Sequence, residues 1–242
     1  MLAAGAGASS QGNRTATRMT AVAEKQKRKV FLVDDHPLVR EWLTNLINQQ
    51  PDLVVCGETE SAPQALQAIA QARPDVAIVD ISLKDSSGIE LIKSLKQSQP
   101  AVAVLVLSMH DESLYAERAL RAGAKGYIMK RETTKKVIDA IRRVLEGKLY
   151  ISNIVAEAIT ARSVTGKVPA SQTPIEQLSD RELEVFEMLG QGLGTRQIAE
   201  TLRVSIKTVQ VYCARMKEKM NLGSGTELLR EAFRWNETKH PR

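Results

Sequence analysis

The sequence predicts an α/β domain with a parallel sheet, followed by a smaller all-α domain. Short apolar runs alternate with helical stretches between residues 29 and 146, and helical segments without strands follow residue 178. A stretch rich in Pro, Gly, Ser and Thr separates the two parts. Strands that are apolar throughout are typical of a parallel sheet with helices on both faces. The 242 residues, 43% of them hydrophobic, suffice for two modest cores.

Five strand–helix pairs make up the first part. The strands are expected over residues 29–34, 52–58, 75–80, 101–108 and 124–130. The helices are expected over residues 37–50, 61–73, 88–97, 114–122 and 133–146. Ser61 can cap the second helix, Pro74 stops it, and Gly123 can end the fourth helix in a left-handed conformation. In such sheets, ligands bind beyond the carboxyl ends of the strands.

The second part consists of helices. A short helix over 152–162 and a tether over 163–177 lead into four helices, expected over 179–190, 195–202, 206–220 and 225–235. Ser179 with Glu182 fits a capping box, and Ser205 can cap the 206–220 helix. One face of this helix carries core residues at three- and four-residue spacing, namely Val209, Cys213, Met216 and Met220. The opposite face carries Lys207, Gln210, Val211, Ala214 and Arg215, with Lys219 near the end.

Composition limits the class of protein. The net charge of +6 permits an anionic partner such as nucleic acid without establishing one. Cys56 and Cys213 lie far apart in apolar-periodic runs, which indicates core residues in a reducing cytosol and neither a disulfide framework nor a metal site. The sequence has no run of about 18 apolar residues, so no membrane span is expected. Residues 1–27 are expected to be a disordered tail, or the translation start is placed too early and Met19 is the real one.

Charged or polar side chains close four of the five predicted strands. Asp34 and Asp35 close the first strand, Asp80 the third, Ser108 the fourth and Lys130 the fifth. All of these ends meet at one sheet edge, where clustered carboxylates repel one another unless a cation such as Mg²⁺ neutralises them. Lys130 and Ser108 could hold a phosphoryl group there, with Asp80 as the nucleophile that forms an acyl phosphate.

Each of these residues also has a structural explanation when it is taken alone. An Asp after a strand is commonly a helix N-cap, and a lone Lys is commonly solvated. The set of strand-end residues favours a phosphoryl site because all its members occupy equivalent positions. His36 is expected to be a loop or first-turn residue, with no partner at metal-ligand spacing.

Four segments resemble the receiver domain of response regulators. They are VFLVDDHPLVR (30–40), VAIVDISLKDSSGIELI (76–92), VLVLSMHDE (104–112) and RAGAKGYIMKRE (121–132). The resemblance covers about residues 28–148 and implies a flavodoxin-like (βα)5 fold with a five-stranded parallel sheet. It also implies that Asp80 accepts phosphate from a sensor histidine kinase.

The same resemblance implies the remaining roles. Mg²⁺ would be bound by Asp35, Asp80 and the backbone carbonyl of Ser82, with Asp34 helping through water. Ser108 would be the switch hydroxyl, Tyr127 the rotating switch aromatic and Lys130 the conserved-type lysine of the family pattern. On spacing alone, Tyr127 fits a half-buried strand aromatic equally well. The family's frequent Met-Pro after the acceptor is replaced by Ser82-Leu83-Lys84-Asp85.

The C-terminal part resembles the LuxR-type helix-turn-helix. The segments LSDRELEVFEMLGQG (178–192) and RQIAETLRVSIKTVQVY (196–212) carry this resemblance, and the pairing with a receiver is typical of the NarL/FixJ class. Tyr212 stands where the family usually has His, and Gly194 where Ser or Asn often starts the second helix. The resemblance implies phosphate contacts by Lys207, Thr208, Arg215 and Lys219, and base-edge contacts by Gln210, Val211 and Ala214.

The prediction is therefore a cytoplasmic, phosphorylation-dependent transcription regulator that is not an enzyme. The domains are expected at 28–148 (receiver) and 178–242 (all-α four-helix LuxR-type helix-turn-helix), after a 1–27 extension and with a 149–177 helix and linker between them. The expected partners are DNA, a sensor histidine kinase, RNA polymerase and, when the chain is phosphorylated or on DNA, a second copy of the chain. No membrane partner is expected.

We expect phosphorylation to pull Ser108 and Tyr127 inward, which promotes dimerisation or frees the 206–220 helix. Two alternatives remain open. In one, the helical domain acts through protein contacts instead of DNA. In the other, the chain is an aspartyl-nucleophile phosphatase resembling haloacid dehalogenases, which need a second Asp two residues after the nucleophile, where Ser82 stands.

Overall fold

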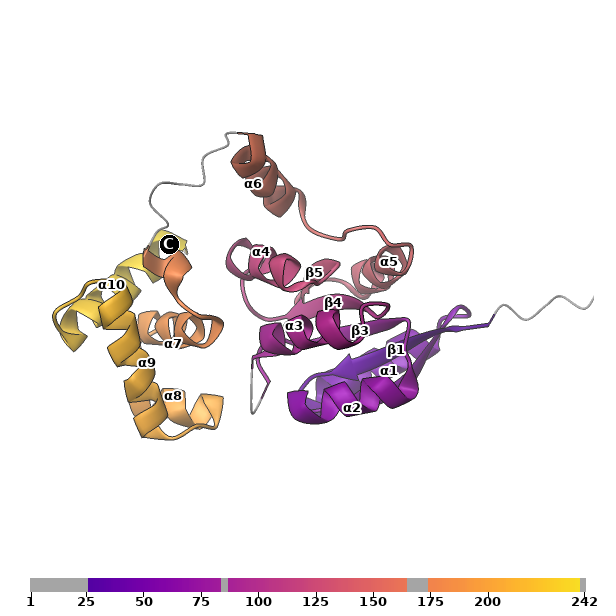
Figure 1. The fold of residues 1–242 in the computed structure, drawn as a ribbon, viewed down its shortest axis with the longest axis horizontal. Helices are drawn as coiled ribbons and strands as arrows, with labels where there is room; N and C mark the ends of the chain where they lie inside the picture. The colour runs from indigo at the N-terminus through magenta and orange to yellow at the C-terminus, as the bar shows by residue number, and fades with distance from the viewer. Residues whose placement is uncertain (1–25, 84–86, 165–173, 240–242) are drawn as a thin grey trace, which may run out of the picture.

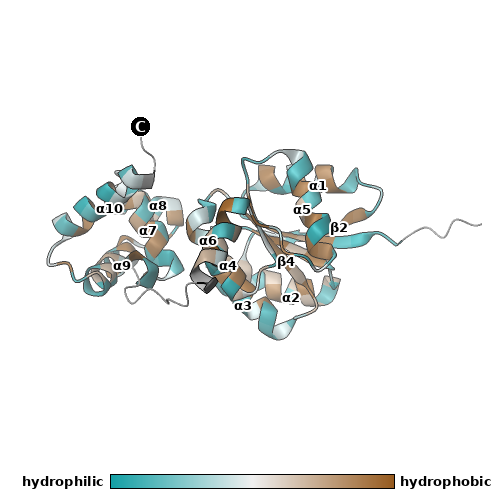
Figure 2. Ribbon diagram, turned by 90° about the horizontal axis from the view of Figure 1, so that it is seen from above, coloured by the Kyte–Doolittle hydropathy of each residue, from teal (hydrophilic) through white to brown (hydrophobic). Residues whose placement is uncertain are grey.

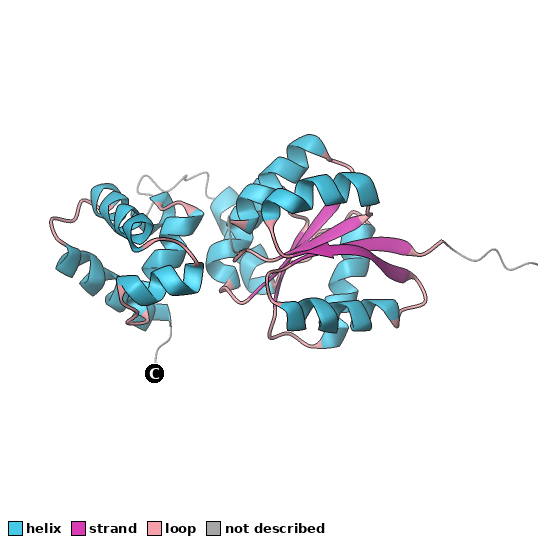
Figure 3. Ribbon diagram, turned by 90° about the horizontal axis from the view of Figure 1, so that it is seen from below, coloured by secondary structure: helices cyan, strands magenta, loops and turns pink. Residues whose placement is uncertain are grey.

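A five-stranded parallel sheet forms the centre of the N-terminal part. The computed structural model describes residues 26–83, 87–164 and 174–239. The strands are β1 Arg28–Val33, β2 Leu53–Thr59, β3 Val76–Val79, β4 Ala103–Ser108 and β5 Gly126–Met129. Their order is β2-β1-β3-β4-β5, and every pairing is parallel. Figure 3 shows the sheet between two layers of helices.

The helices cover both faces of this sheet. They are α1 Pro37–Asn48, α2 Ala62–Ala72, α3 Gly88–Ser98, α4 Glu112–Ala122 and α5 Thr134–Leu145. Successive strand residues point to opposite faces, so Val30 of β1 packs in the core under α1 and α5, whereas Phe31 packs in the core under α2, α3 and α4. Figures 1 and 2 show these two layers, and the predicted (βα)5 fold is confirmed.

The C-terminal part is helical. After α6 Asn153–Val164 and a 3-10 turn, Pro174–Gln177, the chain forms α7 Asp180–Gly190, α8 Thr195–Leu202, α9 Ile206–Lys219 and α10 Gly225–Lys239. The capping box of Ser179 and Glu182 starts α7, and the Ser205 side chain accepts a hydrogen bond from the backbone N–H of Thr208 at the start of α9. The predicted core face of α9 is confirmed, since Val209 and Met216 are fully buried.

Some predicted boundaries differ from the structure. The strand expected over 124–130 is limited to β5 because the Ala124 N–H donates to Ala119 O and closes the end of α4 around Gly123. Ser61 stands at the N-cap of α2, but its side chain makes no capping hydrogen bond. The last four residues of the expected tether form the 3-10 turn, and 165–173 lie outside the described residues.

Two further predictions concern the termini and the cysteines. The expected disorder of residues 1–27 concerns a segment of which all but the last two residues lie outside the described part. Cys56 and Cys213 are partly buried free thiols. Among the described helices, none has the length and apolar character needed to cross a membrane.

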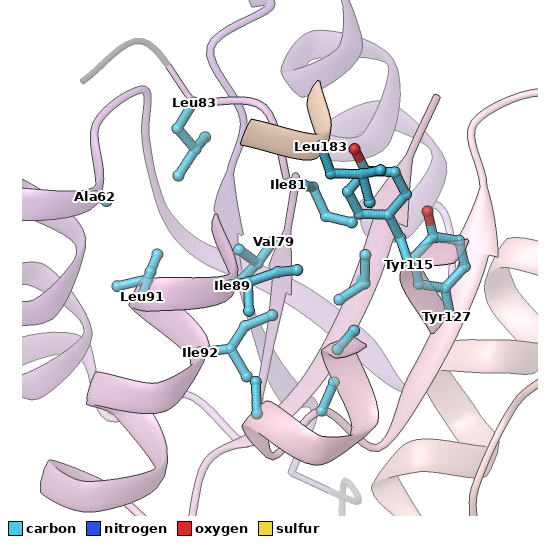
Figure 4. Close-up of a cluster of buried hydrophobic side chains, with 14 of the residues drawn as sticks. Ala62, Val79, Ile81, Leu83, Ile89, Leu91, Ile92, Tyr115, Tyr127 and Leu183 are labelled. Atoms are coloured by element: carbon cyan, nitrogen blue, oxygen red, sulfur yellow. The ribbon is translucent and has the colours of Figure 1, made fainter. Parts of the chain in front are cut away.

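A continuous apolar cluster connects the two parts of the chain. Leu183 of α7 is fully buried and belongs to the same cluster as Ile81, which follows β3, and Tyr115 of α4. Figure 4 shows Leu183 beside Ile81 and Tyr115. The first turns of α7 therefore lie against the sheet edge where β3 and β4 end.

Candidate functional site

Buried carboxylates gather at the carboxyl ends of β1 and β3. Asp34 follows β1 and Asp80 follows β3, and each is 3% exposed. The Asp80 N–H donates to Val33 O at 2.8 Å, so the ladder between these strands continues up to the acidic residue. Ligand atoms of Asp34, Asp35, His36 and Asp80 all lie within 4.8 Å of one another. The structure thus brings together the three aspartates that the sequence placed at this edge.

Lys130 enters the same cluster from the end of β5. Its Nζ lies 2.6 Å from Asp80 Oδ2 and 2.7 Å from Asp34 Oδ2, and its side chain is 6% exposed. The Lys130 N–H donates to Ser108 O at 2.8 Å, which fixes this residue beside the end of β4. Burial lowers the pKa of Lys130, but the two carboxylates outweigh burial and raise it. Lys130 therefore places a positive charge beside Asp80.

One lysine does not balance three carboxylates. Burial raises the pKa of Asp80, Lys130 opposes this shift and Asp34 adds to it. Among the described residues, the buried oxygens Asp35 Oδ1 and Asp80 Oδ1 have no hydrogen-bond partner. Two unpartnered carboxylate oxygens in an acidic cluster are ligands of the kind that Mg²⁺ prefers. The residues fit a divalent cation, and such an ion would favour the ionised form of Asp80.

The expectation for His36 is partly wrong. His36 does stand in the loop as the N-cap of α1, but its ring reaches the acidic cluster. Its Nδ1 lies 3.1 Å from Asp34 Oδ1 and 2.8 Å from Asp35 Oδ1. The second contact is an ion-pair approach, and Asp35 Oδ1 makes no hydrogen bond among the described residues. The ring reaches these oxygens because His36 directly follows Asp34 and Asp35 in the chain, and no partner at metal-ligand spacing is needed.

Ser108 and Tyr127 lie beside the cluster on β4 and β5. Ser108 is fully buried, and its Oγ accepts the His110 N–H at 3.4 Å. Tyr127 is 2% exposed, and its hydroxyl donates to His110 O at 2.8 Å. Tyr127 therefore already occupies an inward position in this structure, which differs from the predicted inward movement on phosphorylation. Both residues hold the main chain of His110.

Ser82 lies two residues after Asp80, in the loop that leaves β3. Its backbone pairs with Ser87 in an isolated antiparallel bridge, and the Gly88 N–H donates to Ile81 O at 2.7 Å. The Ser82 hydroxyl donates to Glu184 Oε1 at 2.7 Å. Its side chain is thus engaged by α7, and its backbone carbonyl stays a predicted metal ligand.

The outer face of α9 carries the residues predicted to touch DNA. The exposed residues on this face are Lys207, Gln210, Val211, Ala214 and Arg215, and Thr208 is partly exposed. Thr208 Oγ1 lies 2.8 Å from Ser205 Oγ at the start of the helix. A basic, exposed helix preceded by the short helix α8 has the geometry of a major-groove reading element.

Lys219 does not extend this face in the way the sequence suggested. Its Nζ pairs with Glu182 Oε2, a carboxylate that is 2% exposed and also accepts the Ser179 N–H. Burial raises the pKa of Glu182, but the hydrogen bonds from Lys219 and Ser179 outweigh burial and lower it. The amine of Lys219 therefore serves the packing of α9 on α7, which argues against the predicted phosphate contact.

Four residues between the two parts of the chain were missed by the sequence argument. They are His110, Tyr115, Glu184 and Glu187, which meet close to Ser82. Burial by itself would lower the pKa of His110. Its hydrogen bonds to Glu184 and Glu187 outweigh burial and raise this pKa to about 9. The only signal in the sequence is the three-residue spacing of the two glutamates on one helix.

Comparison with known proteins places this geometry in a family. The profile of the response regulator receiver domain matches residues 30–142, and that of the bacterial regulatory proteins of the luxR family matches residues 176–232. The oxygen regulatory protein NreC of Staphylococcus epidermidis is 34% identical over 212 residues, covering 85% of this chain and 97% of NreC. The chain is a response regulator with a LuxR-family helix-turn-helix.

Other proteins similar to this response regulator belong to the same family of regulators. The DNA-binding transcriptional activator DevR/DosR of Mycobacterium tuberculosis is 35% identical over 199 residues, covering 82% of the chain and 91% of the relative. A LuxR-family response regulator from Aurantimonas has a TM-score of 0.53 at 33% identity, covering 57% of this chain and 99% of the other. RcsB from Salmonella, at 24% identity, shares the fold with a TM-score of 0.56 and covers 85% of this chain and 98% of RcsB. Regulators of this kind bind DNA and are not typical enzymes.

Proposed function

We propose that this chain is a two-component transcription regulator in which Asp80 accepts a phosphoryl group and α9 binds DNA. The observation that carries the first half is the buried Asp80, which has one oxygen on Lys130 and the other without a partner among the described residues. An attacking carboxylate needs one oxygen for phosphorus while the other stays with a cation, and a phosphoryl group needs the nearby positive charge.

The chemistry is a transfer from a phosphorylated histidine of a sensor kinase. An Asp80 oxygen attacks phosphorus and forms the acyl phosphate, while the N–P bond of the phosphohistidine breaks and the imidazole keeps the electron pair. Lys130 faces the developing charge, and the buried hydroxyl of Ser108 is available as a donor to a phosphoryl oxygen. Mg²⁺ bound by Asp35, Asp80 and the Ser82 carbonyl, with Asp34 acting through water, would neutralise charge on the phosphoryl oxygens.

The second half of the proposal concerns α9. Lys207, Thr208 and Arg215 contact phosphates, and Gln210, Val211 and Ala214 approach base edges in the major groove. Their common exposure on one helix face supports this assignment. Lys219 is left out of this set because Glu182 holds it. In this role, two copies of the chain bind paired half-sites of DNA and RNA polymerase is a further partner. The regulator acts in the cytoplasm.

Incubation with acetyl phosphate tests the acceptor. Phosphoprotein is measured by intact mass, and Asp80→Asn is compared with Asp111→Asn, which changes an aspartate outside the acidic cluster. We expect wild type and Asp111→Asn to take up phosphate and Asp80→Asn to take up none. Uptake by Asp80→Asn at the wild-type level would refute the assignment.

DNA binding is tested by selecting a binding sequence from a random pool and measuring affinity at several salt concentrations. The slope of log K against log salt should fall by about 1 for each lost phosphate contact in Lys207→Ala and Arg215→Ala. Lys93→Ala, which removes an exposed lysine on α3, serves as the control and should keep the wild-type slope. A slope that is flat in the wild type would favour the alternative in which the helical domain binds protein.

A further inference from the structure

Two glutamates of α7 enter the receiver close to Asp80. Glu184 and Glu187 lie three residues apart on one face of α7, and their side chains are 4% and 14% exposed. Arg181 pairs with Glu184 at 2.6 Å within α7 and donates to Leu83 O of the receiver at 2.8 Å, so it attaches the helix one turn before Glu184. Arg118 of α4 also donates to Leu178 O, just before α7, at 2.7 Å. The two parts of the chain are therefore joined by directional polar bonds as well as by the apolar cluster.

Three receiver side chains bind the two carboxylates. The Ser82 hydroxyl donates to Glu184 Oε1 at 2.7 Å, and the Tyr115 hydroxyl donates to Glu187 Oε2 at 3.0 Å. The ring of His110 connects them: its Nδ1 lies 3.1 Å from Glu187 Oε2 and its Nε2 lies 2.7 Å from Ser82 Oγ. Because the Ser82 hydroxyl donates to Glu184, both ring nitrogens of His110 act as donors. We call these five residues the α7 latch.

The α7 latch is bonded to the groups that surround Asp80. Ser82 is the second residue after Asp80, and His110 is the second residue after Ser108. The Ser108 Oγ accepts the His110 N–H at 3.4 Å, and Tyr127 donates to His110 O at 2.8 Å. The Ser108 Oγ accepts this bond and keeps its own proton to donate, so a phosphoryl group that draws Ser108 toward Asp80 also pulls on the main chain of His110. The His110 main chain, in turn, is anchored by a ring that Glu187 holds.

The α7 latch leaves the proposed DNA-reading face of α9 uncovered. Lys207, Gln210 and Arg215 are exposed while the latch is closed. The described contacts of Glu184 and Glu187 therefore restrain the phosphorylation site and not the α9 side chains. This points to a role for α7 in setting the state of the receiver.

We propose that Glu184 and Glu187 are positioning residues for the phosphorylation site, acting through Ser82 and His110 so that the closed α7 latch opposes phosphoryl uptake at Asp80. The inference rests on the proposed function of Asp80. Linkage makes the coupling reciprocal, so a phosphoryl group on Asp80 weakens the α7 latch by the same factor by which the latch weakens phosphoryl binding. The DNA-binding domain thus sets how readily its own receiver is loaded.

The test measures the affinity of the full chain for fluoroberyllate, a phosphoryl analogue, by calorimetry at fixed Mg²⁺. The variant Glu184→Gln/Glu187→Gln keeps the shape of both side chains and removes their charges. Glu200→Gln/Glu231→Gln is the matched control, since it makes the same charge change at two glutamates of α8 and α10 that pair within their own helices. Coupling of ordinary size predicts at least about fivefold tighter binding in the latch variant and no change in the control.

A second readout separates positioning from simple docking. X-ray scattering should show the wild type expanding when fluoroberyllate binds, and the latch variant expanded with or without it. Tyr115→Phe removes only one hydroxyl and keeps the ring that packs on His110, so it gives a smaller gain in affinity even if the double variant folds poorly.

The outcomes are distinguishable. Expansion of the latch variant with an unchanged fluoroberyllate affinity would overturn the inference, because α7 would then be only a docking helix. Affinity changes of equal size in the latch variant and the control would overturn it as well, because they would report net charge. A wild type that binds no fluoroberyllate, as expected only of Asp80→Asn, would overturn the proposed function on which the inference rests.

Discussion

Substituting Gly88 by alanine should disturb Asp80 from eight residues away in the chain. Gly88 is the first residue of α3, and a Cβ added there would lie 1.9 Å from Asp80 O and 2.9 Å from Asp80 C. The shortfall from the 3.4 Å of ordinary contact is about 1.5 Å, and it falls on backbone atoms that cannot rotate away. The Gly88 N–H also donates to Ile81 O at 2.7 Å, which prevents α3 from moving off alone.

The size of the effect follows from this geometry. Overpacking of this kind destabilises a protein by about 1–3 kcal/mol, which lowers the melting temperature of a domain of this size by roughly 4–12 °C. A shift of about 1 Å in a reacting group can lower its rate on the order of a hundredfold. We therefore expect Gly88→Ala to lose phosphoryl uptake from acetyl phosphate by a factor much larger than its loss of stability explains.

The matched control is Gly225→Ala. Gly225 is also the first residue of its helix, α10, but a Cβ added there meets nothing within 4 Å. Melting curves and phosphoprotein yield are measured for both variants below their melting temperatures. If Gly88→Ala resembled Gly225→Ala in both measurements, the close approach of α3 to the backbone of Asp80 would not hold the nucleophile in place.

Two further predictions concern charged groups between helices. Lys219→Ala should lower the free energy of unfolding by about 1–3 kcal/mol because it leaves the buried Glu182 without its cation. The slope of log K against log salt for DNA binding should stay at the wild-type value, unlike that of Lys207→Ala. A reduced slope would restore Lys219 to the DNA contacts. The folded-state pKa of His110, about 9, lies above the ordinary 6.5, so its stabilising contribution is complete below pH 6.5 and is lost as pH rises through 9. Scattering should show the two domains separating over that interval in wild type, and a wild type as compact above pH 9 as below pH 6.5 would contradict this reasoning.

The cluster of acidic residues and Lys130 could be predicted because one topological rule determines it. In a parallel sheet, the residues after every strand meet at one edge, so Asp34, Asp80 and Lys130 must approach each other once the strands are recognised. The apolar runs that identify the strands are strong, and the structure brings Lys130 Nζ to 2.6 Å from Asp80. No such rule applies to His36, which reaches the carboxylates through the local turn before α1.

The contact between the two domains could not be predicted in the same way. Ser82 and Glu184 lie 102 residues apart, and Tyr115 and Glu187 lie 72 apart, with no periodic pattern relating one surface to the other. Lys219 illustrates a related difficulty within one helix. It lies between the core face and the outer face of α9, so spacing alone cannot tell whether its amine turns to Glu182 or to solvent.

The receiver is attached through α7, whereas the side chains suited to reading bases belong to α9. Substitutions at Gln210, Val211 or Ala214 leave every described bond between the domains intact. Descendants of such a gene can therefore acquire new target promoters without retuning their response to the kinase. The same separation suits engineering, in which an altered α9 surface would redirect the regulator while its input stays as it was.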